Sequence, residues 1–228
     1  MWITDFLNLF FPNLCQACGQ PLIKDENIIC LSCLFKLPKT NFHMHQENPI
    51  SQIFWGRVNI NTATSFLFFN KSGNVQKLIH QLKYKGNIET GRYLGKLLGA
   101  DLMESSYFSN IDLIIPVPLH QKKLHKRGFN QSEVIAEGIS MSMDLPVNTT
   151  SLHRLEHTET QTKKARYTRW ENVAGKFGII DPEKLEDKHI LLVDDVLTTG
   201  ATLESCAQSL LEVPQTVVSL VTLAYAQV

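Results

Sequence analysis

Apolar positions along the chain fall into short runs and helical repeats that predict alternating strands and helices. Residues 62–69 (TATSFLFF) and 111–119 (IDLIIPVPL) are apolar runs typical of buried strands, and prolines end the second run. Between them, residues 75–103 carry apolar side chains at helical spacing. A polar break, KGN, interrupts this spacing and predicts two helices in place of one.

The second half of the chain continues this alternation. A helix is expected over residues 130–143, with Asn130 as its N-cap, and another over residues 203–213. The apolar runs 189–193 (HILLV) and 216–226 (TVVSLVTLAYA) predict two more strands. Strands that alternate with helices are typical of a parallel sheet covered on both faces. The sequence therefore predicts an α/β fold with a mainly parallel sheet flanked by helices.

The composition narrows the classes of protein that fit. A chain of 228 residues suffices for one full-sized domain and a small appendage. Lys and Arg together number 22, as do Asp and Glu, so no overall charge excess points to nucleic acid or to an anionic membrane. The apolar residues 1–14 lack a basic leader, and no later run reaches the roughly 18 apolar residues of a membrane helix. We expect a cytoplasmic protein without membrane insertion.

Four of the five cysteines form two pairs near the N-terminus, with the spacing C-x2-C-x11-C-x2-C. Two residues between thiolates allow a tight turn to present both sulfurs to one ion, and two such turns complete the tetrahedral set that zinc accepts. Disulfides are the alternative, but they fit a secreted protein, and we expect no export signal here. With all four positions filled by protein, the zinc would be structural. The predicted ligands are Cys15, Cys18, Cys30 and Cys33.

These patterns divide the chain into three parts. Residues 1–40 are predicted to form a small zinc-ribbon-like module, residues 41–61 a polar and irregular linker, and residues 62–228 the α/β domain. The fifth cysteine, Cys206, lies on a predicted helix and is expected to be a core residue. The zinc module is expected either to stabilise the α/β domain or to bind DNA.

The strand at residues 189–193 runs into two acids and a loop of small hydroxyl residues, VDDVLTTGAT. In open α/β sheets, ligands bind beyond the carboxyl ends of the strands. Residues 196–202 can offer backbone N–H groups, hydroxyls and a helix start to one phosphate, while Asp194 and Asp195 can accept hydrogen bonds from a sugar diol. The glycine patterns of P-loops and dinucleotide-binding folds are missing, which favours a sugar phosphate. The alternative is an acid pair that only caps a helix.

The same stretch, LLVDDVLTTGAT, resembles the phosphoribosyl pyrophosphate signature of type I phosphoribosyltransferases. Together with it, the segments CQACG, KYKG, PVPLH, KRGFNQSE and TQTKKARYTRWENVAGKF resemble, in the same order, the ComF family of competence-associated phosphoribosyltransferase-like proteins. These motifs span nearly the whole chain, from about Cys15 to Thr202. The resemblance implies a type I phosphoribosyltransferase-like fold for the α/β domain.

The resemblance also implies roles for single residues. Asp194 and Asp195 would bind the ribose hydroxyls, with Mg2+ bridging oxygens of phosphoribosyl pyrophosphate. Cations are needed at the departing pyrophosphate, and Arg127 and Arg166 are expected there because their neighbours match the family pattern. For Lys83 and Lys85 of KYKG, a ligand contact and a structural role at a helix end both stay open. The expected 5′-phosphate loop contains Thr198, Thr199, Gly200, Ala201 and Thr202, and the expected pyrophosphate loop contains Pro116, Val117, Pro118 and Leu119.

The function that the resemblance implies is transfer of a phosphoribosyl group to a nitrogen nucleophile, which the sequence does not identify. The family association implies a role in DNA uptake and natural transformation, together with a helicase-like partner or another competence protein. The alternative is a non-catalytic protein that senses a phosphoribosyl ligand. Its zinc module and basic loops would then bind single-stranded DNA or a competence partner.

Overall fold

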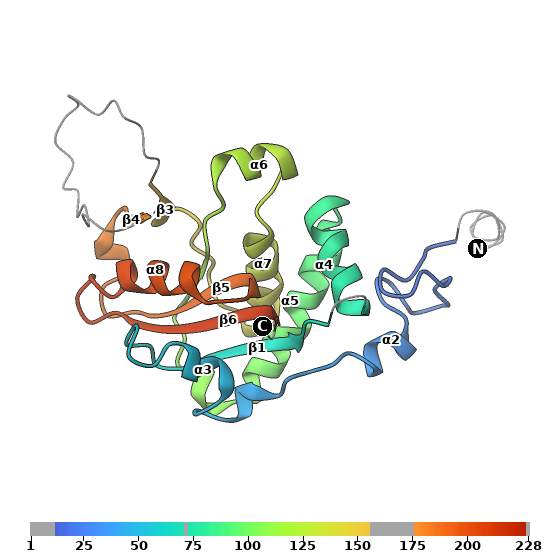
Figure 1. Cartoon of the computed structure of the whole chain (residues 1–228), viewed down its shortest axis with the longest axis horizontal. Coiled ribbons are helices and arrows are strands. Elements are labelled where there is room, and N and C mark those ends of the chain that lie inside the picture. The colour runs from blue at the N-terminus through green and yellow to red at the C-terminus, as the bar shows by residue number, and fades with distance from the viewer. Residues whose placement is uncertain (1–11, 71–72, 156–175, 227–228) are drawn as a thin grey trace.

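The computed structural model describes residues 12–70, 73–155 and 176–226 (Figure 1). A separate antiparallel pair is formed by β3 (Leu152–Arg154) and β4 (Phe177–Ile179). The centre of the fold is a sheet of four strands, and every neighbouring pair in it is parallel. Its strands lie in the order β1 (Ala63–Phe68), β6 (Val217–Tyr225), β5 (His189–Leu197) and β2 (Leu113–Pro116).

Helices of different lengths connect and cover these strands. No helix in the described ranges is long and apolar enough to cross a membrane. The α-helices are α2 (Leu31–Phe35), α3 (Pro49–Ile53), α4 (Asn74–Tyr84), α5 (Ile88–Met103), α6 (Gln121–Arg127), α7 (Gln131–Met143) and α8 (Ala201–Leu210). The short 3-10 helices are η1 (Phe42–Met44), η2 (Ser106–Phe108) and η3 (Pro182–Lys184).

Alternate residues of β5 divide between two cores, one on each face of the central sheet. Leu191 and Val193 belong to the core that also contains buried residues of α4, α5 and α7. Ile190 and Leu192 belong to the core that contains the buried face of α8. Because successive side chains of a strand point to opposite faces, a strand covered on both sides is apolar throughout, as HILLV is. The predicted parallel sheet flanked by helices is confirmed.

The local predictions are confirmed, with changes in the extent of the elements. Helices α4 and α5 separate at residues 85–87, where KGN predicted a break, and the side chain of Asn130 caps α7 by accepting from Ser132 N–H at 3.2 Å. Strand β5 continues past HILLV to Leu197, so Asp194 and Asp195 lie in the strand and not in a loop. Helix α6 was not predicted, because its sequence QKKLHKR has no apolar period.

Residues 41–61, expected to form an irregular linker, instead contain η1 and α3 and pack against the edge of the sheet. Phe54, directly after α3, is completely buried. Asn48 Nδ2 donates to the backbone oxygen of Ala63 at 2.9 Å, and Ser51 Oγ makes hydrogen bonds of 3.2 Å with the backbone N–H and oxygen of Ala63. These bonds satisfy the backbone N–H and oxygen of Ala63, the first residue on the outer edge of β1. The prediction of irregular structure for this segment is therefore wrong. The domain boundaries at residues 40 and 61 stay predictions.

The cysteine segment packs against α4 and shares its core. Cys15 and Cys33 are buried in the same apolar cluster as Leu78 and Leu82 of α4. Residues of the two segments also line a common cavity of about 460 Å³. In Figure 1 the chain before α2 accordingly lies beside α4. Apolar contacts therefore attach this segment to the α/β domain.

Helices α5 and α7 approach each other closely at two glycines. A Cβ atom on Gly138 would lie 2.2 Å from the backbone oxygen of Arg92, and one on Gly95 would lie 2.3 Å from the backbone oxygen of Ile135. Backbone atoms cannot rotate away as the tip of a side chain can, so a larger residue would push the helices apart. The two glycines thereby set the position of α7 over β5.

Substitution of Gly138 tests this packing. Gly138→Ala should lower the free energy of unfolding by about 2–3 kcal/mol, because the added methyl group overpacks the contact. Urea denaturation measures the change. Met141→Ala on the same helix is the matched control, since Met141 is 63% exposed, and it should change the free energy by less than about 0.5 kcal/mol. An equal loss in the two variants would contradict the close contact of α5 and α7.

Candidate functional site

Side chains from two helices hold the acid pair at the carboxyl end of β5. Asp194 Oδ1 accepts hydrogen bonds from Ser132 Oγ at 2.9 Å and from the backbone N–H of Asp195 at 2.8 Å. Asp195 Oδ2 forms an ion pair of 2.8 Å with Lys83 Nζ. Ser132 belongs to α7 and Lys83 to α4. The two carboxylates therefore have different partners, one a hydroxyl and the other a cation.

The surroundings of Asp194 make its carboxyl a weaker acid than an ordinary aspartate. Burial raises the pKa of Asp194 to about 7, and the negative charge of Asp195 acts in the same direction. The hydrogen bonds from Asp195 N–H and Ser132, and the charge of Lys83, lower the pKa but are outweighed. Ionisation of both acids at neutral pH therefore depends on the cations and donors close to them.

The predicted phosphate loop turns from β5 into α8. Gly200 adopts a φ of 77°, which favours glycine, and a Cβ atom there would also lie 3.0 Å from the ring of Phe54. The backbone N–H groups at the start of α8 lie at this end of the sheet. Asp194 and residues 196–203 line one small pocket. Thr198, Thr199 and Gly200 make the turn, and Ala201 and Thr202 are the first residues of α8.

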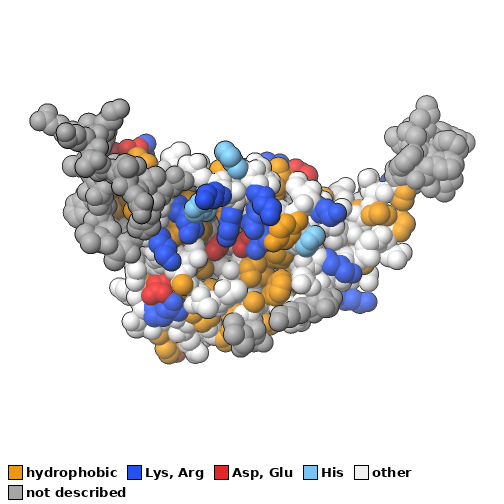
Figure 2. Space-filling view, turned by 45° about the horizontal axis from the view of Figure 1, so that its top comes forward, with side chains coloured by type: hydrophobic (Ala, Val, Ile, Leu, Met, Phe, Trp, Pro, Cys, Tyr) orange, Lys and Arg blue, Asp and Glu red, His pale blue; other side chains and the backbone are white. Residues whose placement is uncertain are grey.

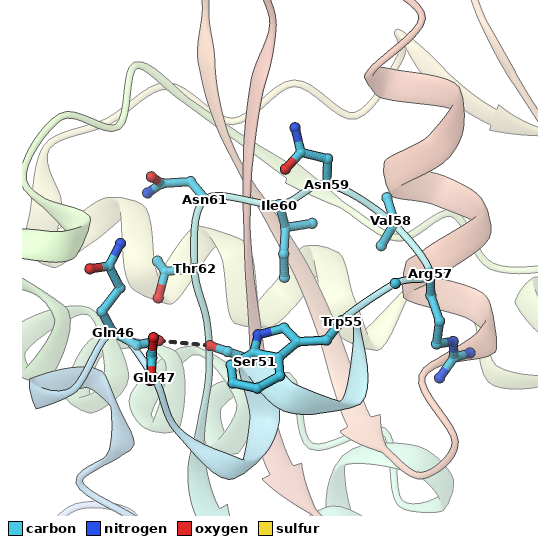
Figure 3. Close-up of a pocket in the computed structure, with 11 residues that line it drawn as sticks. Gln46, Glu47, Ser51, Trp55, Arg57, Val58, Asn59, Ile60, Asn61 and Thr62 are labelled. Atoms are coloured by element: carbon cyan, nitrogen blue, oxygen red, sulfur yellow. Dashed lines mark hydrogen bonds between the residues drawn. The ribbon is translucent and has the colours of Figure 1, made fainter.

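Arg57, from the segment expected to be a linker, braces this loop. Its guanidinium donates to the backbone oxygen of Thr199 at 3.0 Å and forms an ion pair with Glu204 of α8. The sequence did not indicate Arg57, because these partners lie 142 and 147 residues further along the chain. A cavity of about 680 Å³ extends from Trp55 and Arg57 along residues 58–62 (Figure 3). Of the predicted site residues that the structure describes, none lines this cavity.

The predicted pyrophosphate loop begins beside the acid pair. Pro116 ends β2 and pairs with Val193 of β5. Val117 donates from its N–H to the oxygen of Val193 at 2.8 Å, and its own oxygen accepts from Asn130 Nδ2 at 3.0 Å. Pro118 and Leu119, which follow, are partly buried. The structure thus brings the two predicted loops and the acid pair to the same edge of the sheet.

Basic side chains are concentrated at this edge. Helix α6 follows the predicted pyrophosphate loop, and its residues Lys122, Lys123 and Lys126 are exposed. Figure 2 shows Lys and Arg side chains gathered around a small acidic area on this face. The local charge is therefore more basic than the even balance of the whole chain suggested.

The structure describes one of the two arginines that were predicted to contact pyrophosphate. Arg127 donates a hydrogen bond to the side chain of Gln131, and its guanidinium lies 5.8 Å from the centre of the Tyr84 ring. Its charge therefore lies between α7 and the end of α4. Arg166 lies outside the described residues. A contact of either arginine with pyrophosphate stays a prediction.

The contacts of Lys83 and Ser132 with the acid pair were missed by reasoning from the sequence. In the sequence, nothing distinguished Ser132 from an ordinary serine in the first turn of a helix. Lys83 was singled out only through the KYKG motif, which fitted a helix end as well as a ligand contact. The place of KYKG in the order of family motifs was the one signal that pointed to Lys83.

The four N-terminal cysteines form one cluster. Their sulfur atoms all lie within 4.8 Å of one another, and Cys18 Sγ and Cys30 Sγ are 3.8 Å apart. Zn–S bonds of about 2.3 Å in a tetrahedron place the sulfurs about 3.8 Å apart, so the geometry fits zinc. None of the four clustered thiols forms a disulfide bond. Burial raises the pKa of the Cys15 thiol, but backbone N–H groups, that of Cys18 first, outweigh it and lower the pKa to about 6, which favours the thiolate.

The chain is similar in sequence to a known family model and to several known proteins. Residues 129–227 match the model of the phosphoribosyl transferase domain family. The DNA utilization protein YhgH of Escherichia coli K12 is 28% identical over 225 residues, covering 89% of this chain and 92% of the relative. Competence protein F of Haemophilus influenzae is 29% identical over 137 residues, covering 58% and 60%, and competence protein ComFC of Bacillus subtilis is 26% identical over 210 residues, covering 84% and 81%.

Among solved structures, adenine phosphoribosyltransferase from Thermoanaerobacter pseudethanolicus is 16% identical, with a TM-score of 0.40. The match covers 66% of this chain and 73% of that one.

Proposed function

The chain belongs to the ComF family, as a competence-type protein with a phosphoribosyltransferase-like domain, and on this premise we propose its function. The protein binds phosphoribosyl pyrophosphate with Mg2+ and transfers the phosphoribosyl group to a nitrogen nucleophile. The observation that carries the proposal is the pocket shared by Asp194 and the loop 198–202. A carboxylate that can accept from a diol, beside a loop that can donate to a phosphate, matches two parts of one ribose 5-phosphate unit.

The proposed chemistry assigns one task to each part of the edge. The bond from ribose C1 to a pyrophosphate oxygen breaks, and a bond from C1 to nitrogen forms. Asp194 and Asp195 accept hydrogen bonds from the ribose hydroxyls, and their negative charge stabilises the positive charge that develops on the ring. The side chains of this edge offer oxygen donors, which suit Mg2+. Bound Mg2+ would neutralise the charge on the leaving pyrophosphate.

Binding of the ligand can be tested before the acceptor is known. Isothermal calorimetry with phosphoribosyl pyrophosphate and Mg2+ should show one site per chain. An Asp194→Asn/Asp195→Asn variant should lose about a hundredfold or more in affinity, because two charged hydrogen-bond acceptors are replaced by neutral amides. Asp181→Asn, a change at an exposed acid with its own ion pair to Lys184, is the control and should bind as the wild type does. Equal affinity of the wild type and the double variant would refute the site.

We also propose that the cysteine cluster holds one structural zinc ion. The support is the fit of the sulfur positions to a tetrahedral site and the burial of Cys15 and Cys33 in the core shared with α4. With four protein ligands, the ion would have no open position for catalysis. Its contribution would be to stability.

A metal assay tests this proposal. Freshly reduced protein should contain about one zinc per chain by elemental analysis, and Cys18→Ser/Cys30→Ser should contain none. The variant should also unfold at a lower temperature, because zinc binding contributes to folding. Cys206→Ser, a change at a buried thiol outside the cluster, should retain the zinc. Wild-type protein without zinc would overturn the assignment.

In the cell, we propose a role in DNA uptake and natural transformation, in the cytoplasm, together with a helicase-like or other competence protein. The support is that related chains are named competence or DNA utilization proteins. Binding of single-stranded DNA is the second candidate function. The observation in its favour is the group of exposed lysines on α6, a helix whose last residue, Arg127, lies over the ring of Tyr84, which is itself 62% exposed. Cations that follow a phosphate backbone and an aromatic ring that stacks on a base are the usual elements of such a surface.

The salt dependence of DNA binding tests the second candidate. If an oligonucleotide binds through phosphates, its affinity should fall steeply as salt is added. Lys122→Ala/Lys126→Ala should weaken binding and make the salt dependence shallower. Lys184→Ala/Lys188→Ala, an equal change of charge before the start of β5, is the control and should leave both unchanged. A flat salt response in fluorescence anisotropy would rule out this function.

A further inference from the structure

Helix α4 connects the cysteine cluster to the acid pair. At its first residue, Asn74 Nδ2 lies 3.7 Å from Cys33 Sγ. In its last turn, Lys83 Nζ lies 2.8 Å from Asp195 Oδ2. Between these ends Leu78 and Leu82 are completely buried. The apolar face of the helix thus fixes the direction in which Lys83 points.

The ion pair of Lys83 is shielded from water more than an ordinary surface pair. The exposed fraction of the side chain is 20% for Lys83 and 15% for Asp195. Surface ion pairs contribute little because solvent screens them, and screening falls as the pair becomes buried. Removing one partner of such a pair leaves the other charge poorly compensated. Lys83 is therefore the compensating charge for an acid that has a second acid as its neighbour.

The same end of α4 also supports Arg127. Tyr84 follows Lys83, and the guanidinium of Arg127 lies over its ring. Lys85, two residues after Lys83, is exposed, and none of the ion pairs in the described part of the chain involves it. Of the two lysines in the KYKG motif, only Lys83 is thus placed in the site.

We propose that Lys83 is a positioning residue for the sugar-phosphate site, which holds Asp195 in place and lets two ionised acids accept an anionic ligand. The proposal rests on the proposed function, because the ligand is phosphoribosyl pyrophosphate. Without Lys83, the acid pair either takes up a proton or presents two uncompensated charges to a ligand that carries phosphates at both ends. Protonation of the pair removes a hydrogen-bond acceptor for the ribose, and two uncompensated negative charges repel the phosphates.

Calorimetry of three variants tests the role of Lys83. Lys83→Met should bind phosphoribosyl pyrophosphate with Mg2+ about ten- to a hundredfold more weakly than the wild type, as expected for loss of a charge-assisted contact. Lys83→Arg keeps the charge and should recover most of the affinity. Lys85→Met removes the neighbouring charge and should bind as the wild type does. Rescue by arginine would show that the charge positions the acid. Thermal unfolding of each variant measures any general loss of structure.

A second measurement does not need the ligand. In protein with 13C-labelled aspartate carboxyls, the titration of Asp194 should move to higher pH in Lys83→Met, because the charge of Lys83 lowers its pKa, and stay unchanged in Lys85→Met. The groups that act on Asp194 are Asp195, Ser132 and Lys83, with the thiol of Cys206 also close enough to interact. If the wild type does not bind phosphoribosyl pyrophosphate but this shift occurs, the proposed ligand is wrong and the positioning of the acids by Lys83 stands. An unchanged titration in Lys83→Met, or wild-type affinity in that variant, would overturn the proposal.

Discussion

Two carboxylates on adjacent residues at the end of a buried strand are the constraint on which the arrangement of this site depends. Burial and mutual repulsion raise the pKa of Asp194 to about 7, so ionisation of the pair has a cost that neighbouring groups must offset. The backbone N–H of Asp195 and the hydroxyl of Ser132 offset part of this cost by donating hydrogen bonds to Asp194, and the charge of Lys83, paired with Asp195, offsets a smaller part. The positions of α7 and α4 therefore affect whether the acids can act as acceptors at all.

The support for the site comes from segments that are far apart in the chain. Ser132 depends on α7, which the close contact of Gly95 and Gly138 holds against α5. The predicted phosphate loop depends on residues 41–61, since the ring of Phe54 lies close to Gly200 and Arg57 donates a hydrogen bond to the oxygen of Thr199. A loop that binds a phosphate through its backbone must keep its shape before the ligand arrives. These contacts supply that preorganisation without placing a reactive group in the pocket.

Much of the fold could be predicted because its signal is local. Apolar runs and helical spacing identified the strands and helices, and the rule that ligands bind at the carboxyl ends of parallel strands placed Asp194 and Asp195 correctly at the edge of the sheet. Residues 41–61 were misjudged because Asn48 and Ser51 are typical of loops, while here their side chains satisfy the backbone of β1. Arg57 and Ser132 could not be predicted, since their roles depend on partners distant in sequence.

The distribution of charge along the edge explains how acids and an anionic ligand can occupy one site. At the end proposed for the 5′-phosphate, residues 198–202 are uncharged and offer backbone N–H groups and hydroxyls, while the nearby cation Arg57 is engaged with Thr199 and Glu204. At the other end, α6 brings positive charge directly after the predicted pyrophosphate loop, and Lys83 brings positive charge to Asp195. Fixed dipoles can hold a phosphate without drawing the acids toward it, whereas a pyrophosphate that leaves with its charge needs cations. In the proposed complex, the acids between these ends would face the neutral ribose, and Lys83 would compensate part of their negative charge.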